Sequence, residues 1–274
     1  MRTTFNVPND VYHSDDGHIS RSTANMAFRY GPSAYGLMLQ GVRFFKGSSA
    51  TVTGSKFDEL VERRIVEGLA FGQQLAIPPA EVLTSNGQRR GKAYTDWLVD
   101  IESRGLVQAS VDDYELFMRM EESMMANFSA REIVESTTAC QRSTWWTTQE
   151  GHQLKARFDG EAPWGIWDLK STSSDWPSLP KKCVDLGYIW QAVWYTMAAE
   201  EAGVPHGDAS EMPFVFVQTV PPFQTKVRTF PKDRCDAARD DMLCTLNWMH
   251  WAREASDFED PDQTIAEMEF PSWL

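Results

Sequence analysis

Apolar residues recur along the first half of the chain at the three- and four-residue spacing of amphipathic helices. Residues 54–68 show this pattern most clearly, because the helix they predict has one apolar face. That face carries Phe57, Leu60, Val61 and Ile65. By the same spacing and by their end signals, helices are predicted over residues 21–30, 33–39, 92–104, 112–128, 186–203 and 232–255.

From residue 137 onward the apolar period changes to two, which is typical of strands. In residues 151–160, Leu154, Ala156 and Phe158 alternate with polar side chains, so this strand is expected to have one buried face and one solvated face. Strands and helices alternate beyond this point, which predicts an α/β core behind a helical N-terminal region. The other predicted strands cover residues 137–148, 164–171, 212–220 and 225–230.

The 274-residue chain contains no linker rich in proline, glycine or serine, so we expect a single domain over residues 1–274. Its predicted parts are an N-terminal loop and helical segment (1–50), a core (54–230), and a C-terminal helix with an acidic tail (231–274). The net charge of −13 excludes a general polyanion binder. Contact with nucleic acid would therefore need a local basic groove or bound metal ions.

The cysteines and the hydropathy pattern predict a cytoplasmic protein without membrane contact. The N-terminus lacks the apolar region of a secretory signal, and no apolar run approaches the roughly 18 residues that cross a bilayer. The four cysteines lack close pairing, so we expect reduced, partly buried thiols; an iron–sulfur cluster is a disfavoured alternative. They are Cys140, Cys183, Cys235 and Cys244, of which the last two are expected in the core of the final helix.

The candidate chemistry lies on two neighbouring predicted strands. Side chains two residues apart on a strand share a face, so Asp168 and Lys170 project together while Leu169 points into the opposite layer. Asp159, on the preceding strand, can meet them across the hairpin. Two converging carboxylates repel each other unless a cation lies between them, and Mg²⁺ suits oxygen ligands. The alternative is an ordinary solvated strand face.

Two predicted helices can add polar groups to this pair of carboxylates. Gln191 and Tyr195 are four residues apart and share a helix face, and so do Asp58 and Glu62. A bound metal would polarise a phosphate and activate water. The lysine would orient that water or help to take its proton, and it would offset developing negative charge. These residue types are therefore suited to phosphodiester hydrolysis. Taken singly, each pair could equally be a core-facing polar pair or a solvated helix face.

In these segments the sequence resembles the PD-(D/E)XK nuclease superfamily, and within it the RecE-type exonuclease (exonuclease VIII) related to lambda exonuclease. The resemblance spans about residues 10–200 and is specific only over Asp159–Tyr195. It departs from the family at Asp58, where relatives usually carry histidine, and at Phe158, where they often carry proline. The matching segments are Tyr12-His13 with Ile19-Ser20-Arg21-Ser22, Gly54 to Asp58, Lys155-Ala156-Arg157-Phe158-Asp159, Ile166-Trp167-Asp168-Leu169-Lys170-Ser171-Thr172, and Gln191 to Tyr195.

The resemblance implies a central mixed sheet flanked by helices and a set of site residues. Asp159 and Asp168 would be metal ligands, with Glu62 or Asp58 as a further acidic group. Lys170 would be the catalytic lysine. Gln191 and Tyr195 would support the site or hold the DNA backbone. The implied cofactor is Mg²⁺, with Mn²⁺ as an alternative.

Other basic and hydroxyl residues are candidates for DNA contact. Ser20, Arg21 and Ser22 precede a predicted helix and could hold a terminal 5′-phosphate, or they could form an ordinary helix cap. Arg157 shares a strand face with Asp159 and could contact DNA or pair with a carboxylate. Two basic segments could touch phosphates or simply be solvated loops. These are Arg89, Arg90 and Lys92, and Lys181-Lys182.

The resemblance implies a Mg²⁺-dependent exonuclease that degrades one strand of linear duplex DNA, 5′ to 3′, for recombination by single-strand annealing in a phage or prophage. Its implied partners are DNA ends, an annealing protein and further copies of the chain in a ring. Two alternatives remain open: a structure-specific or restriction-type endonuclease with the same fold, and a DNA-binding or assembly module whose nuclease site has decayed.

Overall fold

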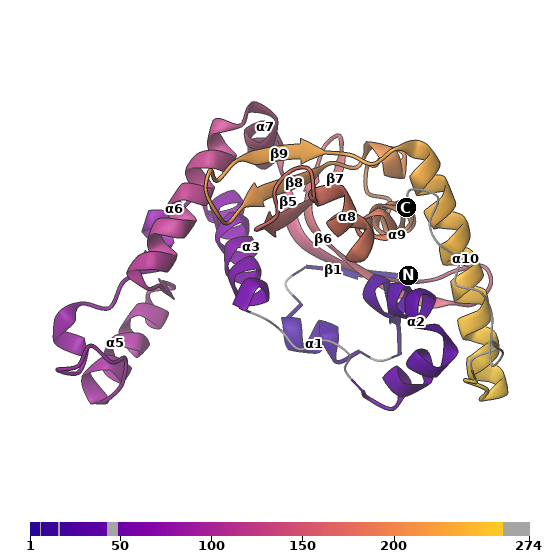
Figure 1. Ribbon diagram of the computed structural model, residues 1–274, viewed down its shortest axis with the longest axis horizontal. Helices are drawn as coiled ribbons and strands as arrows, with labels where there is room; N and C mark the ends of the chain where they lie inside the picture. The colour runs from indigo at the N-terminus through magenta and orange to yellow at the C-terminus, as the bar shows by residue number, and fades with distance from the viewer. Residues whose placement is uncertain (6, 16, 43–48, 260–274) are drawn as a thin grey trace.

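A computed structural model describes residues 1–5, 7–15, 17–42 and 49–259 of the chain (Figure 1). Within this part, seven strands form one mixed sheet. β1, β5, β6, β7, β8 and β9 are neighbours in that order, and the short β2 pairs with β6. These strands are β1 (Arg2–Thr4), β2 (Ile19–Ser20), β5 (Ala139–Thr147), β6 (Gln153–Ala162), β7 (Gly165–Thr172), β8 (Phe214–Gln218) and β9 (Thr225–Arg228).

The directions of the strands make the sheet mixed. β7 and β8 run parallel, as do β2 and β6, whereas the other neighbouring pairs are antiparallel. Helices cover both faces, so the expected α/β fold with a flanked central mixed sheet is confirmed. The main helices are α1 (Asn9–His13), α2 (Arg21–Leu39), α3 (Ser49–Glu67), α6 (Val111–Ala126), α7 (Phe128–Ser136), α8 (Leu179–Asp185), α9 (Tyr188–Ala202) and α10 (Lys232–Ala255).

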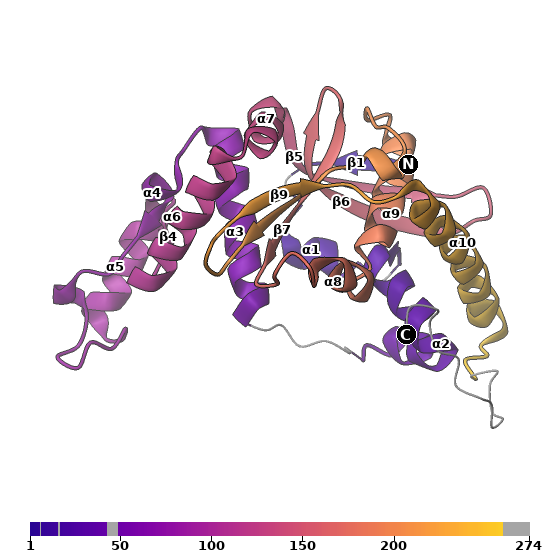
Figure 2. The same cartoon turned by 45° about the horizontal axis from the view of Figure 1, so that its top comes forward.

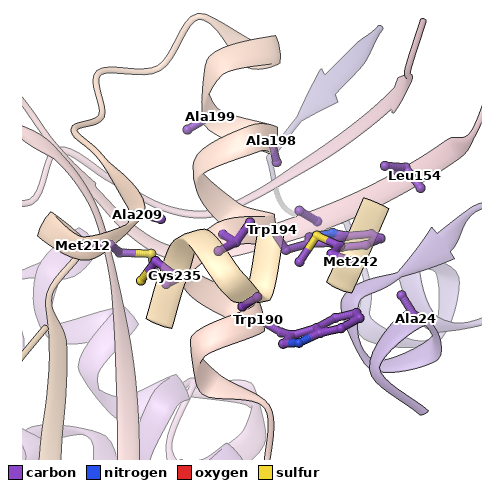
Figure 3. Packing of buried hydrophobic residues seen from close by; sticks show 14 of the residues in the cluster. Ala24, Leu154, Trp190, Trp194, Ala198, Ala199, Ala209, Met212, Cys235 and Met242 are labelled. Atoms are coloured by element: carbon purple, nitrogen blue, oxygen red, sulfur yellow. The ribbon is translucent and has the colours of Figure 1, made fainter. Parts of the chain in front are cut away.

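Strand alternation divides the core into two hydrophobic clusters, one on each face of the sheet. In β8, Phe214 and Phe216 join the cluster formed with α2, α9 and α10, whereas Val215 and Val217 join the cluster formed with α3, α6 and α7. Figure 3 shows the first cluster, in which Trp194 of α9 lies among residues of α2, β6 and α10. N-terminal and C-terminal helices therefore share one core.

Several boundaries differ from the expectations for physical reasons. The predicted helix pair over residues 21–30 and 33–39 is confirmed: α2 consists of two helical parts, separated at Gly31, whose φ of 76° breaks the helix before Pro32. Helices α7 and α8 are short, and the periodicity analysis did not predict them. Lys181 and Lys182 consequently lie on α8 and not in a loop. The predicted acidic tail lies largely beyond residue 259, outside the described residues.

A second correction concerns burial. β6 was expected to have one solvated face, but Lys155 on that face is only 4% exposed, because the N-terminal segment covers it. Cys244 was expected in the core but is exposed, since it lies on the outer face of α10; the other three cysteines are buried, and all four are free thiols. No helix in the described ranges is long and apolar enough to cross a membrane.

A helical arm projects from the core between α3 and α6 (Figures 1 and 2). Its two short strands, β3 and β4, pair in parallel and belong to a separate small sheet. Phe71, Leu75 and Ala109 at its base join the cluster that packs under α3. The elements of the arm are α4 (Phe71–Gln74), β3 (Leu75–Ala76), the 3₁₀ turn η1 (Ala80–Val82), α5 (Lys92–Ser103) and β4 (Val107–Gln108). A second 3₁₀ turn, η2 (Ala209–Glu211), precedes β8.

The pairing of β6 with β7 requires a residue without a side chain at position 160. Gly160 lies opposite Trp167, and a Cβ at this glycine would be 2.2 Å from Nε1 of the indole ring. The ring cannot easily move, because Trp167 is 1% exposed and its Nε1 donates a 2.9 Å hydrogen bond to Thr137 Oγ1.

Gly160→Ala should therefore lower the free energy of unfolding by about 1–3 kcal/mol, the usual cost of overpacking. Urea denaturation measures this change. Gly17→Ala is the control, because an added Cβ there meets only Asp15 Oδ1, at 3.4 Å. Equal stability of the two variants would contradict the expectation.

Candidate active site

The candidate site lies where β6 and β7 separate. The two strands pair only from Gly160 to Ala162 of β6. Beyond this point β7 pairs with β8 instead, starting at Asp168. The β6 segment 156–159 thus has β5 on one side and no paired strand on the other in the described structure. This fork lets side chains from both faces of the sheet meet at one point.

Asp168, Lys170 and Gln191 form the buried centre of the fork. Asp168 is fully buried; its Oδ1 accepts a 2.6 Å hydrogen bond from Nε2 of Gln191, and its Oδ2 forms an ion pair with Nζ of Lys170. Leu169 points into the opposite core cluster, as its place between them predicted. Asp159 approaches from β6, where its Oδ2 accepts a 2.9 Å hydrogen bond from the Leu169 backbone N–H. The structure therefore brings these predicted residues together.

Helix α3 adds two more carboxyl groups. It packs so closely on β7 that a Cβ at Gly54 would be 3.0 Å from Ser171 Oγ. Burial, and then the charge of Asp159, raise the pKa of Asp58 to about 8. Burial also raises the pKa of Glu62, with nearby Glu59 adding to the effect. The two helix residues expected near the metal thus face the carboxylates of the sheet.

The electrostatics of the fork show an excess of negative charge. Burial, followed by the charge of Asp159, raises the pKa of Asp168 well above its usual range. Burial lowers the pKa of Lys170, but Asp168 and Asp159 raise it by more, so the ammonium group stays protonated. One ammonium does not balance several converging carboxyl groups, because each raised pKa reports uncompensated repulsion or desolvation.

The donor chemistry of the fork fits a hard divalent cation. Asp58, Asp159 and Asp168 offer carboxylate oxygens, which Mg²⁺ prefers. Within the described ranges no three His, Cys, Asp or Glu residues are already grouped as a metal cluster. Asp168 is engaged by Lys170 and Gln191, and Asp159 by a backbone N–H.

A large cleft of about 1380 Å³ opens beside the fork. It is lined by the N-terminal segment and by parts of α2, α3, β6, α9 and α10. Asp168, Lys170 and Gln191 do not line it, so Asp159 and α3 lie between the cleft and the buried centre. The predicted residues that do line it are Ser20, Arg21, Ser22, Asp58, Glu62, Arg157, Asp159 and Tyr195.

Tyr195 joins the cleft to the core of the sheet. Its ring contacts Phe158 edge-on, with centroids 5.5 Å apart. Burial, and then the charges of Asp168 and Asp159, raise the pKa of Tyr195 well above its usual range, so its hydroxyl is a donor at neutral pH. The predicted face shared by Gln191 and Tyr195 therefore points toward the carboxylates.

The candidate phosphate-binding segment lies next to this centre. Ser20 caps α2, its side chain accepting a 3.2 Å hydrogen bond from the Thr23 backbone N–H. Arg21 donates to the Leu186 carbonyl at 3.0 Å and, through its other nitrogen, to Oε1 of Gln191 at 3.5 Å. Ser20 therefore forms the helix cap that was one of the two expectations. The side chain of Gln191 lies between Arg21 and Asp168 and bonds to both. Whether this segment also holds a phosphate stays a prediction.

Arg157 lies in the cleft wall but has several partners within the protein. Its guanidinium donates to Ser143 Oγ, Asn9 Oδ1 and the Val7 carbonyl, at 2.9, 2.5 and 3.0 Å. It also lies 4.1 Å from the ring centroid of Tyr12. These contacts fasten the N-terminal segment to β6, so the geometry supports a structural role more directly than contact with DNA.

Two further residues at the site were not predicted. Tyr188 lies beside the catalytic candidate, its ring centroid 5.2 Å from Nζ of Lys170. Gln141 lies in the cleft wall on β5 with a left-handed φ of 54°, between residues that pair with Gly160 and Phe158. For Tyr188 the only signal is its place one turn before Gln191. For Gln141 the sequence contains none, because glutamine has no preference for that backbone region.

The comparisons with known proteins support the fold. No family model and no curated protein matches the sequence. Among solved structures, the chain is similar to a protein from Eubacterium rectale named in its crystal structure as a "putative exonuclease". The TM-score is 0.59 at 13% sequence identity, and the match covers 98% of this chain and 97% of that chain. At this identity the likeness shows a shared fold over the whole length.

The raised pKa of Asp58 predicts how stability depends on pH. A carboxyl group whose pKa is higher in the folded state destabilises the protein as the pH rises from its unfolded value, about 4, to its folded value. Without divalent ions, the free energy of unfolding should therefore fall between about pH 4 and pH 8. Asp58→Asn should remove this term and be more stable than wild type at pH 8, by about 1–3 kcal/mol.

Denaturant unfolding at pH 4.5 and pH 8 tests this expectation, with Asp96→Asn on the exposed face of α5 as the control. Millimolar Mg²⁺ should raise the thermal midpoint of the wild type more than that of Asp58→Asn, because the ion would offset the same repulsion. A wild type no less stable than Asp58→Asn at pH 8 would contradict the assignment of Asp58 to the carboxylate cluster.

Proposed function

We propose that this protein is a metal-dependent DNA exonuclease that degrades one strand of linear duplex DNA. The observation that carries the proposal is the fork, where Asp159, Asp168 and the protonated Lys170 converge beside an open cleft. The likeness in fold to the Eubacterium rectale protein and the resemblance to PD-(D/E)XK nucleases of the RecE type support it.

The residues of the chain have separate tasks in this proposal. Asp159 and Asp168, with Asp58 or Glu62, would hold Mg²⁺, or Mn²⁺ in its place. When bound, the ion would polarise the scissile phosphate and activate a water molecule. Lys170, ion-paired with Asp168, positions the attacking water and offsets the charge that develops on the phosphate. Gln191 keeps Asp168 oriented through its 2.6 Å hydrogen bond.

The finer features of the proposal come from the resemblance. They are 5′-to-3′ polarity, recombination by single-strand annealing in a phage or prophage, an annealing protein as partner, and a ring of identical subunits around DNA. A net charge of −13 agrees with a protein that admits DNA only at a local site. The cleft provides such a site, because cationic side chains line it together with the carboxylates.

Lys170→Ala should lower the rate of Mg²⁺-dependent degradation of a linear duplex by about 100-fold or more, since no other ammonium lies at Asp168 in the described structure. Release of nucleotides from an end-labelled duplex measures the rate. Lys232→Ala is the matched control, because Lys232 is exposed on α10, pairs with Asp208 at 3.1 Å and does not line the cleft. Circular dichroism checks that both variants fold.

The same assay includes a covalently closed circle. An exonuclease leaves the circle intact, whereas cutting would indicate an endonuclease with this fold. If neither Mg²⁺ nor Mn²⁺ supports cleavage of any substrate while DNA is still bound, the proposal fails and a binding module remains.

Arg21 provides a test of end recognition. If the start of α2 holds a terminal phosphate, a 5′-phosphorylated duplex should be degraded faster than the same duplex with a 5′-hydroxyl. Arg21→Ala should reduce this difference to within about twofold, because an arginine–phosphate contact is charge-assisted. Initial rates on the two substrates give the ratio. An unchanged ratio in Arg21→Ala would show that the phosphate is held elsewhere or not at all.

A further inference from the structure

The tip of the helical arm carries positive charge that the proposed catalytic residues do not use. Arg89, Arg90 and Lys92 lie within four positions of one another and are all exposed. Among the described residues, none of their side chains has an ion-pair or hydrogen-bond partner, although Asp96 lies one helical turn from Lys92. In a chain with a net charge of −13, this is an unneutralised local cluster of cations.

Several other cations on the surface differ from this cluster in having acidic neighbours. Arg63 pairs with Glu67, Arg104 with Asp100, and Lys181 with Asp185, each within α-helical spacing. Exposed pairs of this kind neutralise most of the local field and leave little attraction for a distant anion. The arm tip is therefore a place where three cations without an acidic partner in the described structure lie within four positions.

The loop that presents these cations has a defined shape. Thr84 closes it from both directions: its N–H donates to the Gln88 carbonyl at 3.1 Å, its carbonyl accepts from Gly87 N–H at 2.7 Å, and its Oγ1 accepts from Gln88 N–H at 2.9 Å. Gly87 and Gly91 adopt left-handed φ angles of 69° and 94°, which suit tight turns. A closed loop holds its charges in place at a smaller entropic cost on binding.

The base of the arm is fixed to the helix that carries Asp58 and Glu62. Arg63 of α3 donates to the Gly105 carbonyl at 2.6 Å. Arg64 pairs with the buried Glu121 of α6, whose carboxylate also accepts from the Phe71 N–H at 3.1 and 3.2 Å. The contacts with α3 thus fix the position of the arm relative to the carboxyl groups of the site. In both views the arm lies on one side of α1 and α3, and α2 and α10 lie on the other side (Figures 1 and 2).

We propose that the arm tip binds the sugar-phosphate backbone of the duplex whose end lies in the cleft, so that the protein holds DNA at two separate points. This inference rests on the proposed function. Helices α5 and α6, of 12 and 16 residues, are about 18 and 24 Å long. At about 3.4 Å per base pair, the length of these helices corresponds to about five to seven base pairs, so we infer that the tip contacts only a duplex that extends at least this far from the site.

The experiment measures binding without cleavage, using the full-length chain in EDTA and fluorescently labelled DNA hairpins that have one open end. One hairpin has a stem of about 4 base pairs, too short to reach the tip, and the other a stem of about 24. Fluorescence anisotropy gives Kd between 50 and 200 mM salt for wild type and for Arg89→Ala/Arg90→Ala/Lys92→Ala. The control, Arg228→Ala/Lys232→Ala/Arg234→Ala, removes the same charge from exposed positions that do not line the cleft.

The arm variant should bind the long hairpin about 10-fold or more weakly than wild type at low salt, and the short hairpin within about twofold. The slope of log K against log salt on the long hairpin should decrease by about 2–3, since each lost phosphate contact contributes about 0.9. Arg89→Lys/Arg90→Lys should restore the affinity, because charge and not guanidinium geometry is used. The control variant should bind both hairpins like wild type.

The following outcomes would overturn the inference. An equal loss on both hairpins, or in both triple variants, would mean a general loss of charge and no defined contact. An arm variant that binds like wild type but no longer self-associates would mean that the tip contacts an acidic surface of a second copy. If the wild type degrades DNA and the arm variant behaves identically, the arm contact is rejected and the proposed function stands. If the wild type binds neither hairpin, the proposed function is rejected as well.

Discussion

The buried ion pair between Lys170 and Asp168 is the interaction on which the arrangement of the site depends. A carboxylate cannot be fully buried without a compensating charge and hydrogen bonds, and here the ammonium and the amide of Gln191 supply them. β7 presents Asp168 and Lys170 on one face, and α9 places Gln191 over them. The separation of β6 from β7 then lets Asp159 reach the same point from the other strand. The topology of the sheet thus brings together the groups that the buried carboxylate of Asp168 requires.

The centre of the site could be predicted from the sequence because it depends on short-range geometry. Asp168 and Lys170 are two residues apart on a strand, and Gln191 and Tyr195 are four apart on a helix, so spacing alone places each pair on one face. The environment of the polar residues on β6 was predicted less well. Lys155 and Arg157 were expected on a solvated face, yet Lys155 is buried and Arg157 binds the N-terminal segment. Local periodicity cannot show which distant segment covers a strand.

The fold could be predicted as a class but not in its finer parts. Apolar alternation identified β5 to β9 but not the short strands β1 to β4, and the mixed order of the sheet followed from the resemblance. The short helices α7 and α8 were missed, since seven to nine residues give too few turns for a clear period. Gln141 is a further example: its left-handed backbone follows from the surrounding sheet and not from its own preference. Such residues are found in cleft walls, where packing and function compete.

Helix α3 joins two parts of the molecule that the sequence separates. Asp58 and Glu62 on its middle turns face the fork, and Arg63 and Arg64, directly after them, hold the base of the arm. A rigid helix between the acidic centre and the projecting arm keeps the distance between them fixed, because neither end can move without the other. Changes in the arm that leave the site intact are therefore confined to the chain beyond its base. The exposed positions of α5 beyond Lys92 can therefore vary in composition during evolution, whereas α3 can tolerate neither insertion nor deletion between Asp58 and Arg64.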